Sequence, residues 1–423
     1  MNRNVWRQAL LVAIAAGALG ACVGGGDGDE VDTSGGPLPM QVVSPLPLPG
    51  PNAVACSNVA QDFSRIAPDA DVTQYWEARP AENGQPRYIT DILADPGNTL
   101  SFTVNVPNND TLYGSFAGRP VPVVMIVCYP TSAANAHADY LLPTGKVVPH
   151  MQTGADPPTF ANATTRYPVI AFSHGLAGSP LSDDYIPALS NFASYGYIVV
   201  APFHGDPRIS NLRIDDIEDV VRLLPRLRDF VALQSIRPLS MTAALDLLLA
   251  HPQWRDHIDT TQIGGFGASM GGETMLLLAG AGLTTSLGFS WNSVGVDSRI
   301  KAAVGYVPYF GQVFLPAFGR DQHGLDGISL PFLAIAGTAD TTAPLVETRQ
   351  GIDRLTGPRE LVVLEGVKHG FDVPSTNDIY TWTLTFFDAE IRRLPAARQQ
   401  LRTMASVAGG GDDRVIVPYN GAP

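Results

Sequence analysis

The chain has 423 residues, 45% of them hydrophobic and 16% charged, and 40 acidic against 27 basic residues give a formal net charge of −13. This supplies enough apolar side chains for the core of an enzyme-sized protein. The acidic balance, without a long run of Lys or Arg, excludes nucleic acid as an expected partner, because polyanion binding depends on clustered cations. The three cysteines, Cys22, Cys56 and Cys128, are too few for a disulfide framework and lack the spacing of a zinc site.

The first residues have the pattern of a secretory signal. Arg3 and Arg7 precede an apolar run at residues 9–19, which is too short to span a bilayer but fits a signal peptide. The run ends in Leu-Gly-Ala-Cys at residues 19–22, which resembles the processing box of bacterial lipoproteins. The resemblance implies that Cys22 carries a lipid and holds the protein on a membrane of the cell envelope, on its outer-membrane or periplasmic face. The alternative is an ordinary secretory peptide, which leaves the protein secreted.

Four segments are expected along the chain. They are a signal peptide at 1–21, the lipidated Cys22 with a tether at 22–57, a folded domain at 58–396 and a C-terminal tail at 397–423. The tether is predicted from its richness in Gly and Pro. In an oxidising compartment, Cys56 and Cys128 would either form a disulfide that pins the start of the domain to an early strand or remain buried thiols.

Short apolar, β-branched runs alternate with helical stretches after about residue 60 of the chain. Strands that are apolar throughout and separated by helices indicate a mostly parallel sheet covered on both faces, so the predicted fold class is α/β. Functional groups in such sheets lie beyond the carboxyl ends of the strands. The predicted strands are residues 121–128, 168–172, 197–201, 262–266, 302–306, 332–336 and 361–364, and the predicted helices include 241–250 and 380–393.

A helical insertion is predicted at about residues 207–240. Apolar residues recur there at steps of three or four between residues 214 and 231, and acidic residues precede arginines, the order that suits a helix dipole. We expect this helix to be kinked near Pro225. It would either form a lid over the functional site or pack on the edge of the domain.

A Gly-x-Ser-x-Gly pattern surrounds Ser269, between the predicted strand at 262–266 and a helical stretch at 273–279. A nucleophile on a tight strand-to-helix turn needs neighbouring segments to approach closely, and Gly267 and Gly271 permit this. The pattern predicts that Ser269 is a nucleophile. The helix N-terminus behind it favours negative charge developing beside it.

A serine hydroxyl needs a base, normally an imidazole oriented by a carboxylate. His369 follows the predicted strand at 361–364, and Asp340 follows the one at 332–336. The order Ser269, Asp340, His369 is that of the α/β-hydrolase fold and differs from those of chymotrypsin and subtilisin. Asp372 is the nearest rival acid, but it lies on the wrong side of His369 for this order.

Hydrolysis also needs donors for the oxyanion that forms as the carbonyl becomes tetrahedral. We expect one to be the backbone N–H of Met270, the residue after the nucleophile. The second is expected from the glycine-containing loop after the strand at 168–172, where the N–H of Leu176 is the candidate. His174 in that loop is expected to brace the loop rather than to transfer protons.

Five segments resemble the α/β-hydrolase superfamily over roughly residues 110–395: FSHGLAGS, FASYGYIVVAPFHGD, IGGFGASMGGET, IAGTADTTAP and LEGVKHGF. They look most like the branch that holds the platelet-activating-factor acetylhydrolases, dienelactone-hydrolase-like proteins and bacterial cutinase-like polyester hydrolases. The resemblance implies hydrolysis of a carboxylic ester through an acyl-enzyme, with no metal and no cofactor. The sequence departs from it at Ala268, where many lipases and cutinase-like enzymes carry His. It also has Ser269 where dienelactone hydrolases proper use cysteine.

Two further sets of residues have a functional and a structural interpretation. His204 and Asp206 suggest a metal site, but two ligands without a third are more typical of loop hydrogen bonds. An aromatic group follows the strand at 302–306 and would either line an acyl pocket or form core. Its members are Tyr306, Tyr309, Phe310, Phe314 and Phe318.

The function predicted from these motifs is a serine esterase that acts on a small-molecule, lipid or polyester ester. A serine peptidase on the same fold is the first alternative. A catalytically silent binding lipoprotein is the second, although a silent relative would be free to lose Ser269, Asp340 or His369. The motifs do not identify the substrate, because many chemistries share this fold and triad.

Overall fold

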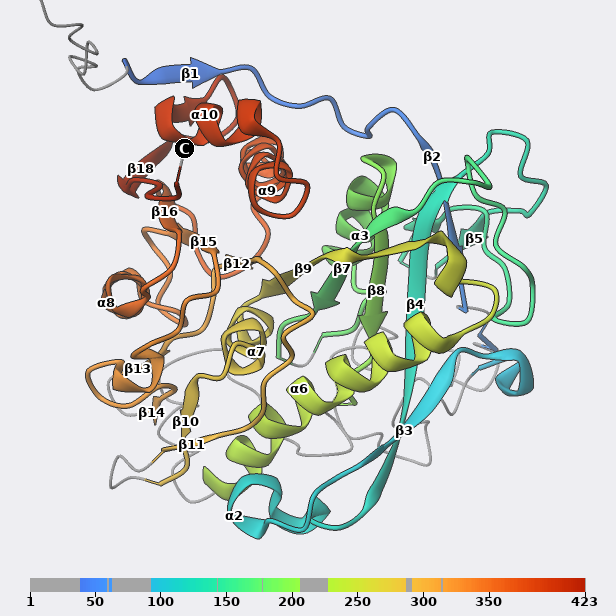
Figure 1. Cartoon of the computed structure of the whole chain (residues 1–423), viewed down its shortest axis with the longest axis horizontal. Helices are drawn as coiled ribbons and strands as arrows, with labels where there is room; N and C mark the ends of the chain where they lie inside the picture. Colours follow the sequence, from blue (N-terminus) through green and yellow to red (C-terminus); the bar gives the residue numbers. More distant parts are fainter. Residues whose placement is uncertain are drawn as a thin grey trace, which may run out of the picture. The chain divides into compact units, whose positions relative to one another are not determined.

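Ten strands of the described residues pair into one central sheet (Figure 1). The structure is a computed structural model, and it describes residues 39–58, 61–62, 93–142, 144–176, 178–205, 227–286, 291–312 and 315–422. Along the sheet the order is β18 (Asp413–Val417), β16 (Arg359–Leu364), β15 (Phe332–Gly337), β12 (Ala303–Tyr306), β9 (Ile258–Ala268), β7 (Tyr167–Ser173), β8 (Ile198–Pro202), β4 (Pro120–Thr131) and β2 (Ala53–Ser57), and β3 (Ser101–Asn105) also pairs with β4.

The middle of the sheet is parallel and its edges are antiparallel. The six strands from β8 to β16 run parallel to one another, whereas β18 is antiparallel to β16, and β4 is antiparallel to β8, β2 and β3. The chain goes from β7 to β8 on one side and later returns to β9 on the other. In sheets of this kind, functional groups usually lie at the carboxyl ends of adjacent strands whose connections leave on opposite sides, as those of β7 and β9 do here. Every strand predicted from apolar runs is present.

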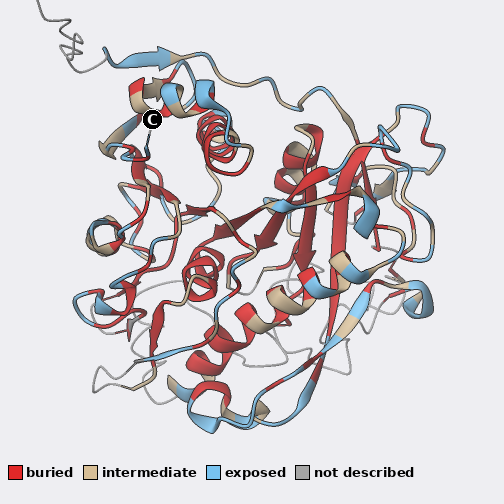
Figure 2. Cartoon of the chain, in the orientation of Figure 1, coloured by how far each residue is buried: buried red, intermediate tan, exposed pale blue. Residues whose placement is uncertain are grey.

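Helices cover both faces of the sheet. The alternation along β4 shows this, because Met125 and Val127 share one buried cluster with α6 and α7, while Val124 and Ile126 share another with α3 and α9. Figure 2 shows the strands buried between these helices. The predicted α/β class is confirmed, and the arrangement is that of the α/β-hydrolase fold. One face carries α6 (Leu227–Ala250), α7 (Met270–Leu278) and α8 (Leu345–Arg354), and the other carries α3 (Tyr185–Ser194), α9 (Thr376–Glu390) and α10 (Pro395–Thr403).

No helix among the described residues is long and apolar enough to span a membrane.

The remaining described elements are short. The small elements are β1 (Gln41–Val43) paired with β17 (Met404–Val407), β5 (Tyr140–Leu141) with β6 (Val147–Val148), β10 (Gly282–Thr284) with β11 (Trp291–Ser293), β13 (Gly311–Gln312) with β14 (Leu315–Pro316), the helix α2 (Asp110–Tyr113), and single 3-10 turns at Pro96–Asn98, Gly114–Phe116, Arg255–His257 and His323–Leu325.

The domain begins earlier than predicted. The tether was expected to reach residue 57, but β1 and β2 already pair with β17 and β4, and the unit that holds the sheet starts at Pro39. The prediction failed because β2 is a short strand preceded by many prolines, and its stability comes from pairing with a distant segment. Cys56 and Cys128 lie directly opposite each other in β2 and β4 and form a disulfide, with Cα atoms 4.1 Å apart. The N–H of Cys56 bonds to Pro149 instead, so this is a non-hydrogen-bonded pair, the kind in which side chains approach most closely.

The predicted C-terminal tail at 397–423 is wrong over most of its length. Most of α10, together with β17 and β18, falls in that range, and β18 adds an antiparallel strand to the sheet beside β16. Trp382 of α9 donates a hydrogen bond of 2.6 Å to Asp413, which ties this end to the helical layer. The glycine run before β18 favoured a tail with at most one short strand, because it removes the composition that usually marks a folded segment.

The helical insertion is described only in its last part. Residues 206–226, which include the predicted kink at Pro225, lie outside the described residues. From Leu227 the chain forms one helix, α6, which continues through Pro238 to Ala250. The end of the insertion and the helix predicted at 241–250 are therefore parts of one continuous helix.

Candidate active site

Ser269 stands at the turn from β9 into α7, with φ 54° and ψ −120°. A non-glycine residue at positive φ stores about 1–3 kcal/mol of backbone strain and persists only where its surroundings hold it. Three hydrogen bonds do so here. The N–H of Ser269 donates to the carbonyl of Tyr306 (2.9 Å), and its carbonyl accepts from the N–H groups of Gly272 (2.9 Å) and Tyr309 (3.0 Å). The hydroxyl is thereby held at the carboxyl edge of the sheet, at the N-terminus of α7.

The two glycines of the motif are required by close packing. A Cβ at Gly267 would lie 2.1 Å from the carbonyl carbon of Gly271, and one at Gly271 would lie 1.9 Å from the carbonyl oxygen of Ser173. Both contacts are with backbone, so a larger residue could not be accommodated by a side-chain rotation. The second contact also brings the end of β7 against the nucleophile turn.

His369 and Asp340 lie in line with Ser269. His369 Nε2 is 2.9 Å from Ser269 Oγ, and His369 Nδ1 is 2.8 Å from Asp340 Oδ2. Asp340 Oδ1 accepts from the N–H groups of Thr342 (2.9 Å) and Ala343 (2.8 Å), and its side chain is fully buried. The structure thus brings together the three side chains that the sequence suggested for the triad, from the ends of β9, β15 and β16.

The rival acid, Asp372, has a different partner. Its Oδ2 accepts from the N–H (3.1 Å) and the hydroxyl (2.8 Å) of Ser375, at the start of α9. The turn that carries His369 is fixed by Tyr306, whose hydroxyl donates to the carbonyl of Gly370 (2.6 Å) and whose ring packs on Phe371. Asp340, and not Asp372, is therefore the carboxylate that orients His369.

The loop after β7 passes directly beside the nucleophile. A Cβ at Gly175 would lie only 3.5 Å from the Cβ of Ser269. Among the described residues, no acceptor takes the N–H of Leu176, and Met270 opens α7, where the first N–H groups have no intrahelical acceptor. Both predicted oxyanion donors therefore belong to segments that flank Ser269, and both are available to a ligand.

His174, which was expected to brace this loop, has its Nδ1 2.8 Å from the carbonyl of Gly175. Two further side chains that hold the loop were not foreseen. Arg237, fully buried on α6, donates to the carbonyls of His174 (2.5 Å) and Gly175 (2.9 Å). Tyr185 at the start of α3 accepts from the N–H of Gly175 (3.1 Å). The available signal was a cation inside an otherwise apolar helical stretch, Ser-Ile-Arg-Pro-Leu at residues 235–239.

His204 makes loop hydrogen bonds, as the second interpretation expected. Its Nε2 lies 2.8 Å from Ser173 Oγ and its Nδ1 lies 2.7 Å from Ser240 Oγ. Burial, followed by the nearby charge of Arg237, lowers the pKa of His204 well below its usual value. Asp206 lies outside the described residues. Within the part of the chain that the structure describes, no group of three or more His, Cys, Asp or Glu side chains is placed to hold a metal ion.

The aromatic residues after β12 belong to the core, and the pocket interpretation is not supported. Phe310 packs against Phe318 and Phe332, and Tyr309 packs against Phe230. All of these are buried. Phe314 lies outside the described residues, as does Cys22.

One family model matches part of the chain. It is platelet-activating factor acetylhydrolase, isoform II, and it covers residues 143–214. The match includes β7, the loop to Leu176, α3 and β8, but not Ser269, Asp340 or His369. This segment is similar to that family, and the similarity supports a hydrolase of the serine esterase class. No curated protein matches the chain.

Proposed function

We propose that the protein is a serine-dependent carboxylic ester hydrolase that works through an acyl-enzyme. The observation that carries the proposal is the pair of hydrogen bonds that joins Asp340 to His369 and His369 to Ser269. A serine next to an oriented imidazole, on a strained strand-to-helix turn, is the arrangement of a nucleophile and its base.

The hydrogen bonds define which nitrogen of His369 carries the proton. The carboxylate oxygens of Asp340 act as acceptors, so His369 Nδ1 donates to Oδ2 and His369 Nε2 is left as the acceptor for the hydroxyl of Ser269. When Ser269 Oγ attacks the ester carbonyl, its proton moves to Nε2. Asp340 then stabilises the imidazolium and keeps the ring in place.

The negative charge that forms on the carbonyl oxygen needs preorganised donors. The N–H groups of Leu176 and Met270 fill this role in the proposal, supported by the N-terminus of α7. Collapse of the tetrahedral intermediate transfers the proton from Nε2 to the leaving alkoxide and leaves Ser269 acylated. Water, deprotonated by the same nitrogen, then releases the carboxylic acid and restores the hydroxyl of Ser269.

The first test is a comparison of Ser269→Ala with Ser57→Ala on a chromogenic short-chain ester. Ser57 is also a buried serine, but it lies on β2 at the far edge of the sheet. We expect the first variant to lose turnover by about 10⁴-fold or more and the second to keep it. Full turnover in Ser269→Ala would refute the proposal.

Esters are the proposed substrates because the matching family is named for an acetylhydrolase activity. The candidates are small esters, lipids and polyesters. Rates on esters of increasing acyl length, phospholipid vesicles and polyester films would identify the class. Equal kcat/KM for an ester and its matched amide would favour a peptidase instead.

We also propose that Cys22 anchors the enzyme to a membrane of the cell envelope. The support is the apolar run at residues 9–19 and the small residues before Cys22. The expected result is incorporation of labelled fatty acid and sedimentation with membranes, both lost in Cys22→Ser. Unlabelled wild-type protein in the soluble fraction would contradict the anchor.

A further inference from the structure

Three buried polar side chains of α6 reach three different parts of the candidate active site. Gln234, Arg237 and Ser240 are spaced three residues apart, so they follow one side of the helix. Gln234 contacts the first turn of α7, Arg237 the loop after β7, and Ser240 the loop after β8. Polar groups in a helix this buried are costly unless each is satisfied, so the pattern indicates a specific use.

The contacts of Arg237 fix the direction in which the N–H of Leu176 points. A peptide unit is planar and trans, so the carbonyl of Gly175 and the N–H of Leu176 point in opposite directions. Arg237 Nη2 holds that carbonyl at 2.9 Å, and His174 Nδ1 holds it at 2.8 Å. The N–H of Leu176 is thereby directed away from Arg237.

The preceding peptide unit is fixed in the same way. Arg237 Nη1 binds the carbonyl of His174 at 2.5 Å, and the N–H on the other side of that peptide, from Gly175, donates to the hydroxyl of Tyr185. Two successive peptides are therefore clamped, and the guanidinium fork is the side-chain group that can hold two carbonyls at once.

A chain of hydrogen bonds continues from Arg237 to the end of β7. The hydroxyl of Ser240 donates to the carbonyl of Arg237 (2.9 Å), so its oxygen accepts from His204 Nδ1–H. His204 Nε2 then accepts from the hydroxyl of Ser173, the last residue of β7 before the loop. The lowered pKa of His204 keeps it neutral, which this arrangement requires.

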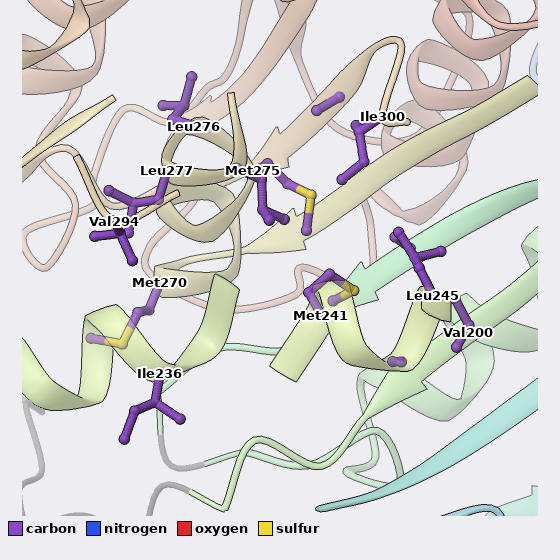
Figure 3. Packing of buried hydrophobic residues seen from close by; sticks show 14 of the residues in the cluster. Val200, Ile236, Met241, Leu245, Met270, Met275, Leu276, Leu277, Val294 and Ile300 are labelled. Carbon is purple, nitrogen blue, oxygen red and sulfur yellow. The ribbon is translucent and has the colours of Figure 1, made fainter. Parts of the chain in front are cut away.

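The contact between α6 and α7 fixes the position of this side of α6 relative to Ser269. Gln234 Nε2 donates to Glu273 Oε1 at 2.6 Å, one turn after Ser269. Figure 3 shows Ile236 and Met241 of α6 and Met270 and Met275 of α7 among the side chains of the buried cluster that holds the two helices. The two proposed oxyanion donors, the N–H groups of Leu176 and Met270, are thus both held in position relative to α6.

We propose that Arg237 is a positioning residue that preorganises the oxyanion site by clamping the peptides on either side of Gly175. The proposal rests on the proposed esterase function. Arg237 touches no reacting atom. It acts through the peptide of Gly175 and Leu176, whose polarisation by the buried cation strengthens the N–H as a donor.

The experiment compares Arg237→Met and Arg237→Lys with Arg299→Met. Arg299 also contacts α6, through the carbonyl of Thr242 and the side chain of Asp246, but its hydrogen bonds go to these residues and to Asp297 and not to the loop after β7, so it is the matched control. Steady-state rates on a chromogenic ester are normalised to active sites by titration with a fluorophosphonate. The affinity of a trifluoromethyl ketone, which forms an oxyanion on the serine, is measured in parallel.

We expect kcat to fall by about 10²-fold in Arg237→Met and by about tenfold in Arg237→Lys, with KM within about twofold of wild type. The trifluoromethyl ketone should lose affinity by the same factor as kcat/KM, and Arg299→Met should match wild type. A purely structural role would lower the melting temperature and the fraction of active sites without changing kcat per active site. If Arg237→Met does not fold, Arg237→Lys decides.

Wild-type kcat and ketone affinity in the folded Arg237 variants would overturn the inference. Failure of the proposed function has a separate signature. In that case the ketone and the fluorophosphonate would not modify the wild-type enzyme at Ser269 at all.

Discussion

Gly271→Ala is the substitution whose effect follows most directly from the geometry of the site. Its Cβ would lie 1.9 Å from the carbonyl oxygen of Ser173, 2.7 Å from the carbonyl carbon and 3.1 Å from the carbonyl oxygen of His174. Real Cβ atoms essentially never come within 3.0 Å of such neighbours. The turn at Ser269 must therefore separate by about 1 Å from the end of β7 and the loop that follows it, since all three contacts are with backbone atoms and none is with a flexible side chain.

That separation moves the N–H of Leu176 away from the position of the oxyanion. A displacement of about 1 Å at a catalytic group costs about 10²-fold in rate, or about 2.7 kcal/mol of transition-state stabilisation. We expect kcat of Gly271→Ala to fall by about this factor while KM changes little. Overpacking should also cost about 1–3 kcal/mol of stability.

The assay is steady-state hydrolysis of a chromogenic ester by Gly271→Ala and by Gly97→Ala. Gly97 has no atom within 4 Å of its virtual Cβ and needs no positive φ, so its substitution controls for the added methyl group. We expect Gly97→Ala to behave as wild type. A folded Gly271→Ala enzyme with wild-type kcat would show that Gly271 does not set the distance between the nucleophile and the oxyanion loop.

Three further predictions concern stability, pH and the acid of the triad. Removing the disulfide with Cys56→Ala and Cys128→Ala releases a loop that spans 72 residues. The free energy of unfolding in urea should fall by about 4 kcal/mol while kcat stays unchanged, and an unchanged unfolding midpoint would contradict this. Burial raises the pKa of Glu273 to about 8, so the folded protein holds a proton that the unfolded chain releases near pH 4.5, and stability falls as pH rises between these values. The advantage of Glu273→Gln in unfolding free energy should therefore grow from pH 5 to pH 8, and a constant difference would refute the assignment. Asp340→Asn should lose about 10⁴-fold in kcat, whereas Asp372→Asn should stay near wild type, and the reverse ranking would make Asp372 the orienting acid.

The parallel part of the sheet was predictable because its signal is local. Its strands contain short apolar runs that are buried on both faces, and Ser269, Asp340 and His369 come in the turns that follow three of these runs. Their residue types and chain order were enough to suggest that they meet at one edge of the sheet. The hydrogen-bond distances between these three side chains could not be derived from their spacing in the sequence.

The edges of the sheet were not predictable in the same way. β2 and β18 are short, follow Pro-rich or Gly-rich segments, and owe their structure to partners far away in the sequence. The disulfide between Cys56 and Cys128 depends on the register of β2 and β4. The sequence therefore allowed it beside two buried thiols but did not decide between them. The local sequence of a strand carries little information about which distant strand it pairs with.

The support of the oxyanion loop was missed for a related reason. Arg237 lies in a helix more than 60 residues from His174 and Gly175, and nothing in the sequence indicates that the three meet. A buried arginine becomes interpretable only when its acceptors are known. The aromatic group after β12 shows the converse, because residues such as Phe310 are equally apolar whether they line a pocket or fill a core.

The central claim is that Ser269 is acylated during turnover. The most direct test is to quench the full-length enzyme during hydrolysis of a slowly deacylating ester and to measure the mass of the peptide that contains Ser269. We predict an increment equal to the acyl group on Ser269, which disappears when the ester is exhausted. Continued turnover with Ser269 unmodified at every time point would contradict the account.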